Sequence, residues 1–472
     1  MKLAVLGGGP GGYIAAIRAA QLGMEVTLIE EDKNLGGTCL NRGCIPTKAL
    51  VEASMRFKSL QEAAGFGLEL GQSPVVDLAK VQERKNALVR RLAMGTKGLV
   101  ERNGVKIIQG HGRLVSDHTL EVDGQVLEFD AMILATGSRT ATPKFFPIDG
   151  RRVITSDHIL NLTELPKSMI VVGSGAVGME FASIFAAFGT KISLIELAPR
   201  IMPLEDHEIS SEMQRLCRKA GWRIFTGAKT EKIEVTSEGV KVTGEGLAAA
   251  DEPLQAEIML VAIGRTPNLE DVGLDKVGVE LTERGRVKVD QFMRTSVANI
   301  YAIRDIVPTP QLAHMASAEG ILAVEHLAGL TPRTLNASHC PAATYCDPEV
   351  ASVGLTQEQA ESQGRSVKVG KFPFAALGKA AIGGHTDGFV KVVAACEGED
   401  KPHLILGVHI LGAHACDLIA EGALALEKGA TLEDIAHTIH PHPSLSESLA
   451  EAAHQALGAP LNFLPPPKRR GR

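Results

Sequence analysis

The chain has 472 residues, a formal net charge of −6 and 44% hydrophobic residues. This length exceeds what one hydrophobic core supports, so we expect about three domains. The net negative charge argues against a nucleic-acid partner. No apolar run approaches the roughly 20 residues that a membrane helix needs, and MKLAVLGGGP lacks the continuous apolar stretch of a signal peptide. We therefore expect a cytoplasmic protein with neither nucleic-acid nor membrane partners.

The first predicted nucleotide-binding unit starts at residue 2. An apolar run, residues 2–6, precedes GGGPGG and a helical pattern, and a second apolar run ends at Glu30. Gly7, Gly9 and Gly12 fit the pattern G-x-G-x-x-G. Its first glycine permits a tight turn, its second lets a pyrophosphate approach the backbone, and its third lets the helix pack on the strand. The helix N-terminus would face the phosphates, and Glu30 would bind ribose hydroxyls.

The same pattern recurs in SMIVVGSGAVGMEFASIFAAFGTKISLIEL, with Gly173, Gly175 and Gly178 followed by Glu196. Each copy places its acid 23 residues after its first glycine (30−7 and 196−173). Two copies in a strand–turn–helix–strand context are far more specific than one, so we predict two Rossmann-like domains and two dinucleotides. Glu196 favours NAD over NADP at the second, although Arg200 could serve a 2′-phosphate.

Two similar segments suggest that the second domain is inserted in the first. FDAMILATGSRT and AEIMLVAIGRTPN are apolar strands that break at Gly137 and Gly264, and NIYAIRDI would return the chain to the first domain. We predict boundaries at residues 1–146 and 273–338 for the first domain, 147–272 for the second, 339–460 for a C-terminal domain and 461–472 for a flexible basic tail.

Seven cysteines, an odd number, argue against a disulfide framework. Cys39 and Cys44 are separated by four residues in GGTCLNRGCIPTKAL. Pro46 suits the first turn of a helix, which places Cys44 near a helix N-terminus, and Lys48 follows one turn later. Both the N-terminus and the ammonium favour a thiolate, so the pair predicts thiol–disulfide electron transfer. The other cysteines are predicted to be buried thiols: Cys217, Cys340, Cys346, Cys396 and Cys416. No metal site is predicted.

Over nearly its whole length the chain resembles the pyridine nucleotide–disulfide oxidoreductases. The similarity rests on both glycine motifs, the cysteine stretch, ATGS, AIGRTPN, YAIRD, LAHMASAEG, DPEVASVGLT and HPHPSLSE. It implies an α/β fold with FAD at the first turn, NAD at the second, and an α+β C-terminal domain that forms a homodimer. The cysteine stretch is most similar to that of members that oxidise dihydrolipoyl groups. The resemblance therefore implies oxidation of free dihydrolipoamide, or of the lipoyl domain of a 2-oxoacid dehydrogenase or glycine cleavage complex, with NAD as acceptor.

The resemblance also implies roles for single residues. Cys44 would face the flavin, and Cys39 would exchange with the substrate disulfide. Lys48 would lie by the flavin, paired with Glu180. Gly264 would contact NAD. Beyond the first glycine turn, the implied FAD-binding residues are Gly37, Thr38, Gly112, Thr136, Gly137, Asp305 and Ala313.

A dithiol oxidation needs a base to take up the thiol protons, and the C-terminal HTIHPHPSLSE offers several histidines. By composition alone, His437 and His440 are rivals of His442. The match to His-Pro-x-x-x-Glu implies that His442 is the acid/base, that Glu447 orients it, and that both reach the cysteine pair of the partner subunit.

Arg304 departs from the family pattern, which usually has a glycine in YAIRDI. An arginine there could clash with FAD or hold its backbone in a region costing about 1–3 kcal/mol, or it could reach a phosphate. We expect weakened FAD retention.

The alternatives are a glutathione- or mercuric-type flavin disulfide reductase and a non-catalytic flavoprotein subunit. The tail lacks the extra cysteine pair of mercuric reductases, and Glu196 disfavours the NADP of glutathione reductases. A non-catalytic protein has no need to keep all five of Cys39, Cys44, Lys48, His442 and Glu447.

Overall fold

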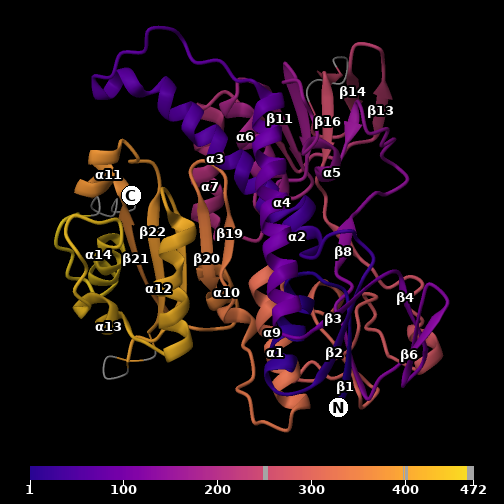
Figure 1. The fold of residues 1–472 in the computed structure, drawn as a ribbon. Coiled ribbons are helices and arrows are strands. Elements are labelled where there is room, and N and C mark those ends of the chain that lie inside the picture. Colours follow the sequence, from indigo (N-terminus) through magenta and orange to yellow (C-terminus); the bar gives the residue numbers. More distant parts are fainter. Residues whose placement is uncertain (248–252, 397, 399–401, 465–472) are drawn as a thin grey trace. The chain divides into compact units, whose positions relative to one another are not determined.

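The computed structural model describes residues 1–247, 253–396, 398 and 402–464 (Figure 1). Its internal contacts divide the chain into two compact units. Unit 1 combines Met1–Leu165 with Gly264–Ala337, and unit 2 combines Pro166–Ile263 with Ser338–Arg472. The finer domain boundaries drawn from the sequence stay predictions, and residues 465–472 of the predicted tail lie outside the described residues.

The core of unit 1 is a parallel five-stranded sheet. Its strand order is β18 (Ile300–Ala302), β7 (Ala131–Leu134), β1 (Lys2–Leu6), β2 (Glu25–Glu30) and β3 (Lys106–Gln109). The strands are apolar on both faces because each face is covered by its own cluster of buried side chains, as parallel sheets require. The return of the chain through β18, expected from NIYAIRDI, is confirmed.

Helices and small sheets complete unit 1. On one side of the sheet, α1 packs closely on α9. A short antiparallel pair joins β8, in the first segment of this unit, to β17, at the point where the chain re-enters the unit. The bounds are α1 (Pro10–Gln21), α2 (Gly37–Arg42), α3 (Cys44–Gln61), α4 (Leu78–Arg102), β4 (Gly112–Ser116), β5 (Thr119–Val122), β6 (Gln125–Glu128), β8 (Ser138–Thr140), β9 (Val153–Ile154), α5 (Ser156–Ile159), β17 (Arg265–Pro267), α8 (Leu274–Val277) and α9 (Ala313–Leu327).

Unit 2 begins with a second parallel sheet built like the first. Within this unit its strand order is β12 (Arg223–Thr226), β11 (Lys191–Glu196), β10 (Ser168–Val172) and β16 (Ile258–Val261). The helices are α6 (Ala176–Ala187) and α7 (His207–Lys219), and an antiparallel sheet contains β13 (Lys232–Val235), β14 (Val240–Thr243) and β15 (Leu254–Ala256). The predicted second Rossmann-like unit is confirmed.

The rest of unit 2 is an antiparallel sheet with helices, the predicted α+β C-terminal domain. Its strand order is β19 (Ala342–Thr344), β20 (Val350–Gly354), β23 (Ile405–Leu411), β22 (Phe389–Ala395) and β21 (Val367–Pro373). In Figure 1, α12 and α14 lie beside these strands, and their apolar residues share the sheet's core. The helices are α10 (Gln357–Ser362), α11 (Gly378–Gly383), α12 (Ala415–Lys428), α13 (Leu432–His437) and α14 (Glu447–Ala456).

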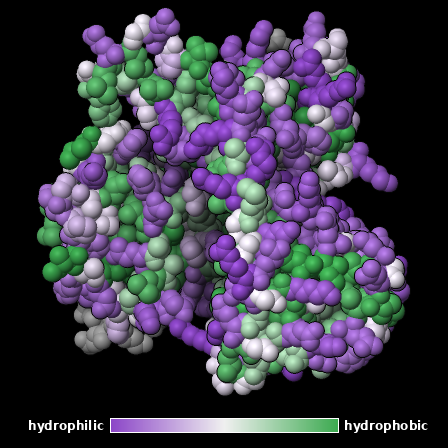
Figure 2. Space-filling view, viewed as in Figure 1, coloured by the Kyte–Doolittle hydropathy of each residue, from purple (hydrophilic) through white to green (hydrophobic). Residues whose placement is uncertain are grey.

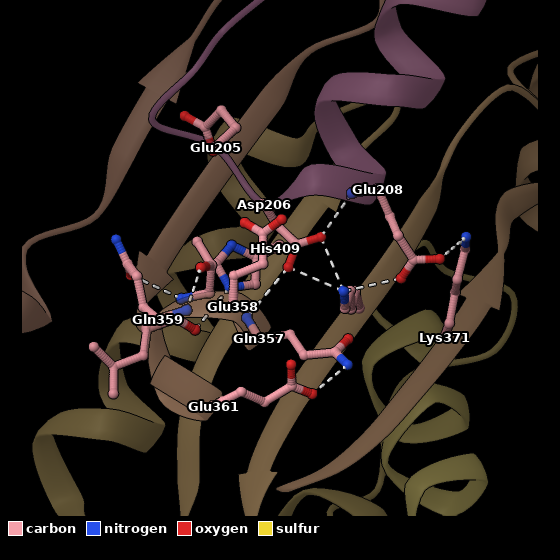
Figure 3. A network of polar contacts seen from close by, with 12 residues as sticks. Glu205, Asp206, Glu208, Gln357, Glu358, Gln359, Glu361, Lys371 and His409 are labelled. Atoms are coloured by element: carbon pink, nitrogen blue, oxygen red, sulfur yellow. Dashed lines mark hydrogen bonds and ion pairs between the residues drawn. The ribbon is translucent and has the colours of Figure 1, made fainter. Parts of the chain in front are cut away.

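An ion-pair network that is buried at one end and exposed at the other ties α7 to the C-terminal sheet within unit 2 (Figure 3). Lys391 Nζ lies 2.9 Å from both Asp206 carboxylate oxygens and 2.9 Å from Glu208 Oε2. The Lys371 ammonium binds the other Glu208 oxygen, also at 2.9 Å. Asp206 additionally caps α7 by accepting the Glu208 N–H. The side chains of Lys391 and Asp206 are only 2% and 1% exposed, so removing the charge of Lys391 would leave that of Asp206 buried without its compensating partner.

Three cysteines differ from the sequence prediction. Cys217 and Cys346 are buried, as expected, but Cys340, Cys396 and Cys416 are only partly buried. Cys396 directly follows β22 and Cys416 lies in the first turn of α12, positions where an element reaches the surface. The prediction of burial is therefore wrong for these three.

Hydrophilic side chains cover much of the face shown in Figure 2, with hydrophobic areas between them. Among the described helices, none is both long and apolar enough to cross a bilayer. The expected cytoplasmic location stays a prediction.

Candidate active site

The first glycine turn connects β1 to α1 and leaves no room for side chains. Gly7 has φ +108°, and a Cβ there would overlap the Ala135 carbonyl oxygen. A Cβ at Gly12 would overlap the Gly7 carbonyl oxygen. These two glycines therefore allow the tight turn and the close approach of α1 to the strand, as the motif predicts.

Glu30, at the end of β2, organises the same turn. Its carboxylate accepts the Gly8 N–H at 2.6 Å and the Asp32 N–H at 2.8 Å. Burial raises the pKa of Glu30 above its ordinary value, although both N–H donors act in the opposite direction. Glu30 thus lies beside the glycine turn, where a ribose hydroxyl would find an acceptor.

A pocket opens at this turn within unit 1, enclosing about 640 Å³ that is partly open to solvent. The predicted FAD-binding residues in its lining are Gly7, Gly9, Glu30, Gly37, Thr38, Gly112 and Thr136. Arg304 also lines it. The turn, the acid and the pocket therefore fit FAD, with Arg304 as the departure.

Other predicted residues sit around this pocket, and three partners that sequence reasoning missed position them. The Thr136 hydroxyl donates to the Asn268 carbonyl at 2.6 Å, and the Asn268 amide donates to the Thr136 carbonyl at 3.0 Å. The Ser138 hydroxyl donates to Asp305, and Arg265 Nε donates to that hydroxyl at 2.7 Å.

The missed residues carried a signal in the sequence. Asn268 and Arg265 belong to AIGRTPN, and Ser138 to ATGS, two stretches that mirror each other and pair as β8 and β17. Of the remaining predicted residues, Gly137 adjoins Ser138 with φ +67°, and Ala313 is the first residue of α9.

The cysteine pair lies in the same unit as the pocket. Cys39 belongs to α2, and α3 begins at Cys44, which confirms the predicted helix N-terminus. The pKa of Cys39 is raised well above its ordinary value, mainly through its hydrogen bond with Cys44 and then through burial, while Arg304 and Lys48 oppose the rise. Because the two thiols are hydrogen-bonded to each other, loss of the first proton leaves one negative charge shared within the pair.

The second glycine turn, in unit 2, repeats the geometry of the first. Gly173 has φ +98°, and a Cβ at Gly178 would overlap the Gly173 carbonyl oxygen. The Glu196 carboxylate accepts from the Ser174 N–H at 2.9 Å and from the Ser174 hydroxyl at 2.6 Å. Around Gly175, no described atom other than those of the glycine and its chain neighbours lies within 4 Å of the Cβ position, so the turn is open where a pyrophosphate would approach.

Arg200, the residue that could have served a 2′-phosphate, is engaged elsewhere in unit 2. Its Nη1 lies 3.1 Å from Glu358 Oε1, and its Nη2 donates to the Glu205 carbonyl at 3.2 Å. Gly264, assigned to unit 1, has φ +135° and accepts the Ala141 N–H through its carbonyl.

The C-terminal histidines have different environments. His442 Nδ1 lies 2.7 Å from Glu447 Oε1, and the His442 side chain is 80% exposed. Both ring nitrogens of His440 are occupied, by the Thr438 carbonyl and by Glu421, each at 2.9 Å. This contrast favours His442 over its neighbour as the group available to a substrate.

Glu447 begins α14 and is held by two donors. It accepts the Ser444 N–H at 2.8 Å as well as the contact from His442. Partial burial would raise the pKa of Glu447, but these two hydrogen bonds outweigh it and hold the pKa below its ordinary value. The carboxylate is therefore ionised at neutral pH and fixes the orientation of the imidazole.

Glu180 lies on α6, 4% exposed, and accepts the Tyr345 N–H at 3.0 Å. Lys48 lies on α3 in unit 1. Because the two residues belong to different units, their expected pairing stays a prediction.

Comparisons with known proteins cover nearly the whole chain. A family model described as pyridine nucleotide-disulphide oxidoreductase matches residues 1–320, and that of the family's dimerisation domain matches residues 340–453. The dihydrolipoyl dehydrogenase of Bacillus subtilis (strain 168) is 44% identical, covering 97% of this chain and 98% of the relative. That of Geobacillus stearothermophilus is 43% identical, covering 98% and 97%.

Among solved structures, LpdA from Mycobacterium tuberculosis superposes with a TM-score of 0.89 at 26% identity, covering 96% of this chain and 99% of that one. The predicted fold class, two nucleotide-binding domains with a dimerisation domain, is confirmed by these matches. The chain belongs to the pyridine nucleotide-disulphide oxidoreductase family.

Proposed function

We propose that the chain is a dihydrolipoyl dehydrogenase, which oxidises dihydrolipoamide to lipoamide and reduces NAD to NADH. The observation that carries this proposal is the cysteine pair, with Cys39 in α2 and Cys44 at the start of α3 one turn before Lys48, in the same unit as the glycine-turn pocket. Full-length identity of 43–44% to dihydrolipoyl dehydrogenases supports the choice of substrate.

The exchange step uses the oxidised pair, a Cys39–Cys44 disulfide. A substrate thiolate attacks the Cys39 sulfur, which forms a mixed disulfide and releases Cys44 as a thiolate. The second substrate thiol then attacks the substrate sulfur bound to Cys39, which closes the lipoyl disulfide and returns Cys39 as a thiol. Two electrons have passed to the protein, and Lys48 favours the negative charge left on Cys44.

His442 manages the protons of this exchange. It takes the proton of the first attacking substrate thiol as a general base. When the second thiol attacks, His442 gives that proton to the departing Cys39 sulfur and takes the proton of the second thiol, so one proton remains on the imidazole. Glu447 keeps His442 Nδ1 in its hydrogen bond, so Nε2 is the atom that meets the substrate. We further propose that the protein is a homodimer in which His442 serves the cysteine pair of the partner subunit. The matched dimerisation domain and the 80% exposure of His442 support this arrangement.

We propose one cofactor for each of the two glycine turns. When bound in the pocket of the first turn, FAD would accept the two electrons of the dithiol and deliver them to NAD as a hydride. Gly7, Gly9 and Glu30 would hold FAD, and the open turn around Gly175 would hold NAD. The engagement of Arg200 by Glu358 supports NAD rather than NADP. The lipoyl group would come as free dihydrolipoamide or on the lipoyl domain of a 2-oxoacid dehydrogenase or glycine cleavage complex.

The test is a turnover assay on the FAD-loaded protein. Dihydrolipoamide and NAD should give NADH, and the variant Cys44→Ser should give none because no disulfide can form. The proposal would be contradicted if the wild-type protein produced no NADH from dihydrolipoamide. It would also be contradicted if Cys44→Ser still produced NADH. With NADH as the donor, oxidised glutathione in place of lipoamide checks the choice of substrate, and equal rates of reduction for the two disulfides would contradict it.

A further inference from the structure

The second glycine of each nucleotide turn faces different surroundings, which gives the chain an internal comparison. Gly175 opens onto space: apart from the glycine and its chain neighbours, no described atom lies within 4 Å of its Cβ position. At Gly9, the equivalent position overlaps Arg304 Nη1, with Cζ at 2.7 Å. The second glycine of the motif exists to let a pyrophosphate reach the backbone. In the first turn, a guanidinium fills that volume.

The guanidinium of Arg304 is enclosed by glycine loops from three parts of unit 1. Besides Gly9, its Nη1 lies 3.2 Å from the Cβ position of Gly37 and 3.1 Å from that of Gly137. Arg304 is 8% exposed, and its side chain makes no ion pair or hydrogen bond with the described residues. It also adjoins the N-terminus of α1, which carries a partial positive charge. A buried cation thus stands where an anionic group would be stabilised.

The backbone of Arg304 is held firmly in place. Its φ of +76° is in the left-handed region that favours glycine. Its N–H donates at 2.7 Å to Glu319, which is fully buried and also accepts the Thr309 hydroxyl at 2.5 Å. The Cα therefore stays where it is, and only rotation of the side chain can vacate the space at Gly9.

We propose that Arg304 occupies the diphosphate subsite of the FAD pocket and lowers the affinity of the protein for FAD. This inference rests on the proposed function in taking FAD as the occupant of the pocket. A diphosphate and the guanidinium overlap at Gly9, so binding requires the side chain to leave. Gly37 and Gly137 restrict its path, and part of the binding free energy is consumed in that displacement. Arg304 is thus a residue that sets the affinity of the protein for FAD.

The test measures FAD affinity directly, with no dithiol and no NAD present. Apoprotein is titrated with FAD, and binding is followed by flavin fluorescence and absorbance for the wild type, Arg304→Gly, Arg304→Asn and Arg304→Met. Glycine and asparagine vacate the subsite and both tolerate positive φ. Methionine keeps a long side chain but removes the charge. NAD binding to the second turn serves as the control for folding.

We expect Arg304→Gly and Arg304→Asn to bind FAD more tightly than the wild type by about tenfold or more, with Arg304→Met close to the wild type. Unchanged or weaker binding by the glycine and asparagine variants would overturn the proposal, since the guanidinium would then move without cost or bind the diphosphate. Binding by Arg304→Met as tight as that by Arg304→Gly would also overturn it, because the charge of the side chain and not its bulk would be the cause. Turnover of FAD-saturated Arg304→Gly with dihydrolipoamide tests the proposed function separately.

Discussion

The buried pair of Lys391 and Asp206 should contribute strongly to the stability of unit 2. In Lys391→Met, Asp206 keeps its charge at a site where its side chain is 1% exposed, without the ammonium 2.9 Å away. Leaving one buried partner uncompensated costs about 3–5 kcal/mol of unfolding free energy. For a unit of this size, that corresponds to a loss of about 6–20 °C in the unfolding midpoint, at about 2–4 °C per kcal/mol.

Lys371→Met is the matched control. This lysine contacts the same Glu208 at the same 2.9 Å, but both its side chain and that of Glu208 are 41% exposed. Exposed pairs contribute about 0–1 kcal/mol, so the control should shift the midpoint far less. Calorimetry is the suitable assay, because a chain of several domains need not unfold in one step.

The pH dependence of the unfolding midpoint tests the same ion pair in a second way. Burial would raise the pKa of Asp206, but the contact with Lys391 outweighs it and lowers the pKa below its ordinary 3.8. A lowered carboxyl pKa contributes stability above 3.8 that is lost as the pH falls through the folded-state value. The difference in unfolding midpoint between the wild type and Lys391→Met should therefore become smaller at acidic pH. Equal midpoints for Lys391→Met and Lys371→Met at neutral pH would refute the reasoning.

Three further predictions concern the site. Glu447→Gln should lower kcat for dithiol oxidation by about 10–100-fold, because a charged hydrogen bond to His442 contributes about 1.5–3 kcal/mol; an unchanged kcat–pH profile would count against it. Cys39→Ser should abolish dihydrolipoamide oxidation, measured as NADH formation, and residual turnover at the wild-type rate would contradict its exchange role. Glu358→Ala should release Arg200 and tighten NADP binding a few-fold, by about 0.5–1 kcal/mol, as measured by titration; no change would show that Arg200 cannot reach the nucleotide.

The sequence predicted those parts of the molecule whose information is local. Each glycine turn and its acid lie within 23 residues, and their roles follow from sterics and hydrogen bonding that a short segment carries by itself. The start of α3 at Cys44 was likewise predictable, because Pro46 suits the first turn of a helix.

What the sequence could not provide depends on residues brought together from far apart. Lys391 lies in FVKVVAA, where its presence in an apolar strand hinted at a buried partner, but Asp206 is 185 residues away. Arg304 was recognisable as a departure from the family pattern, yet its position against Gly9 depends on the turn after β18 and on Glu319. Such contacts become visible only in the folded chain.

The most direct test of the proposed function is an anaerobic titration of the FAD-loaded protein with dihydrolipoamide before NAD is added. We predict a new long-wavelength absorption band from the Cys44 thiolate against the flavin, absent in Cys44→Ser, because the substrate reduces the cysteine pair and leaves the charge on Cys44. A flavin spectrum that stays unchanged at excess dihydrolipoamide would contradict the account.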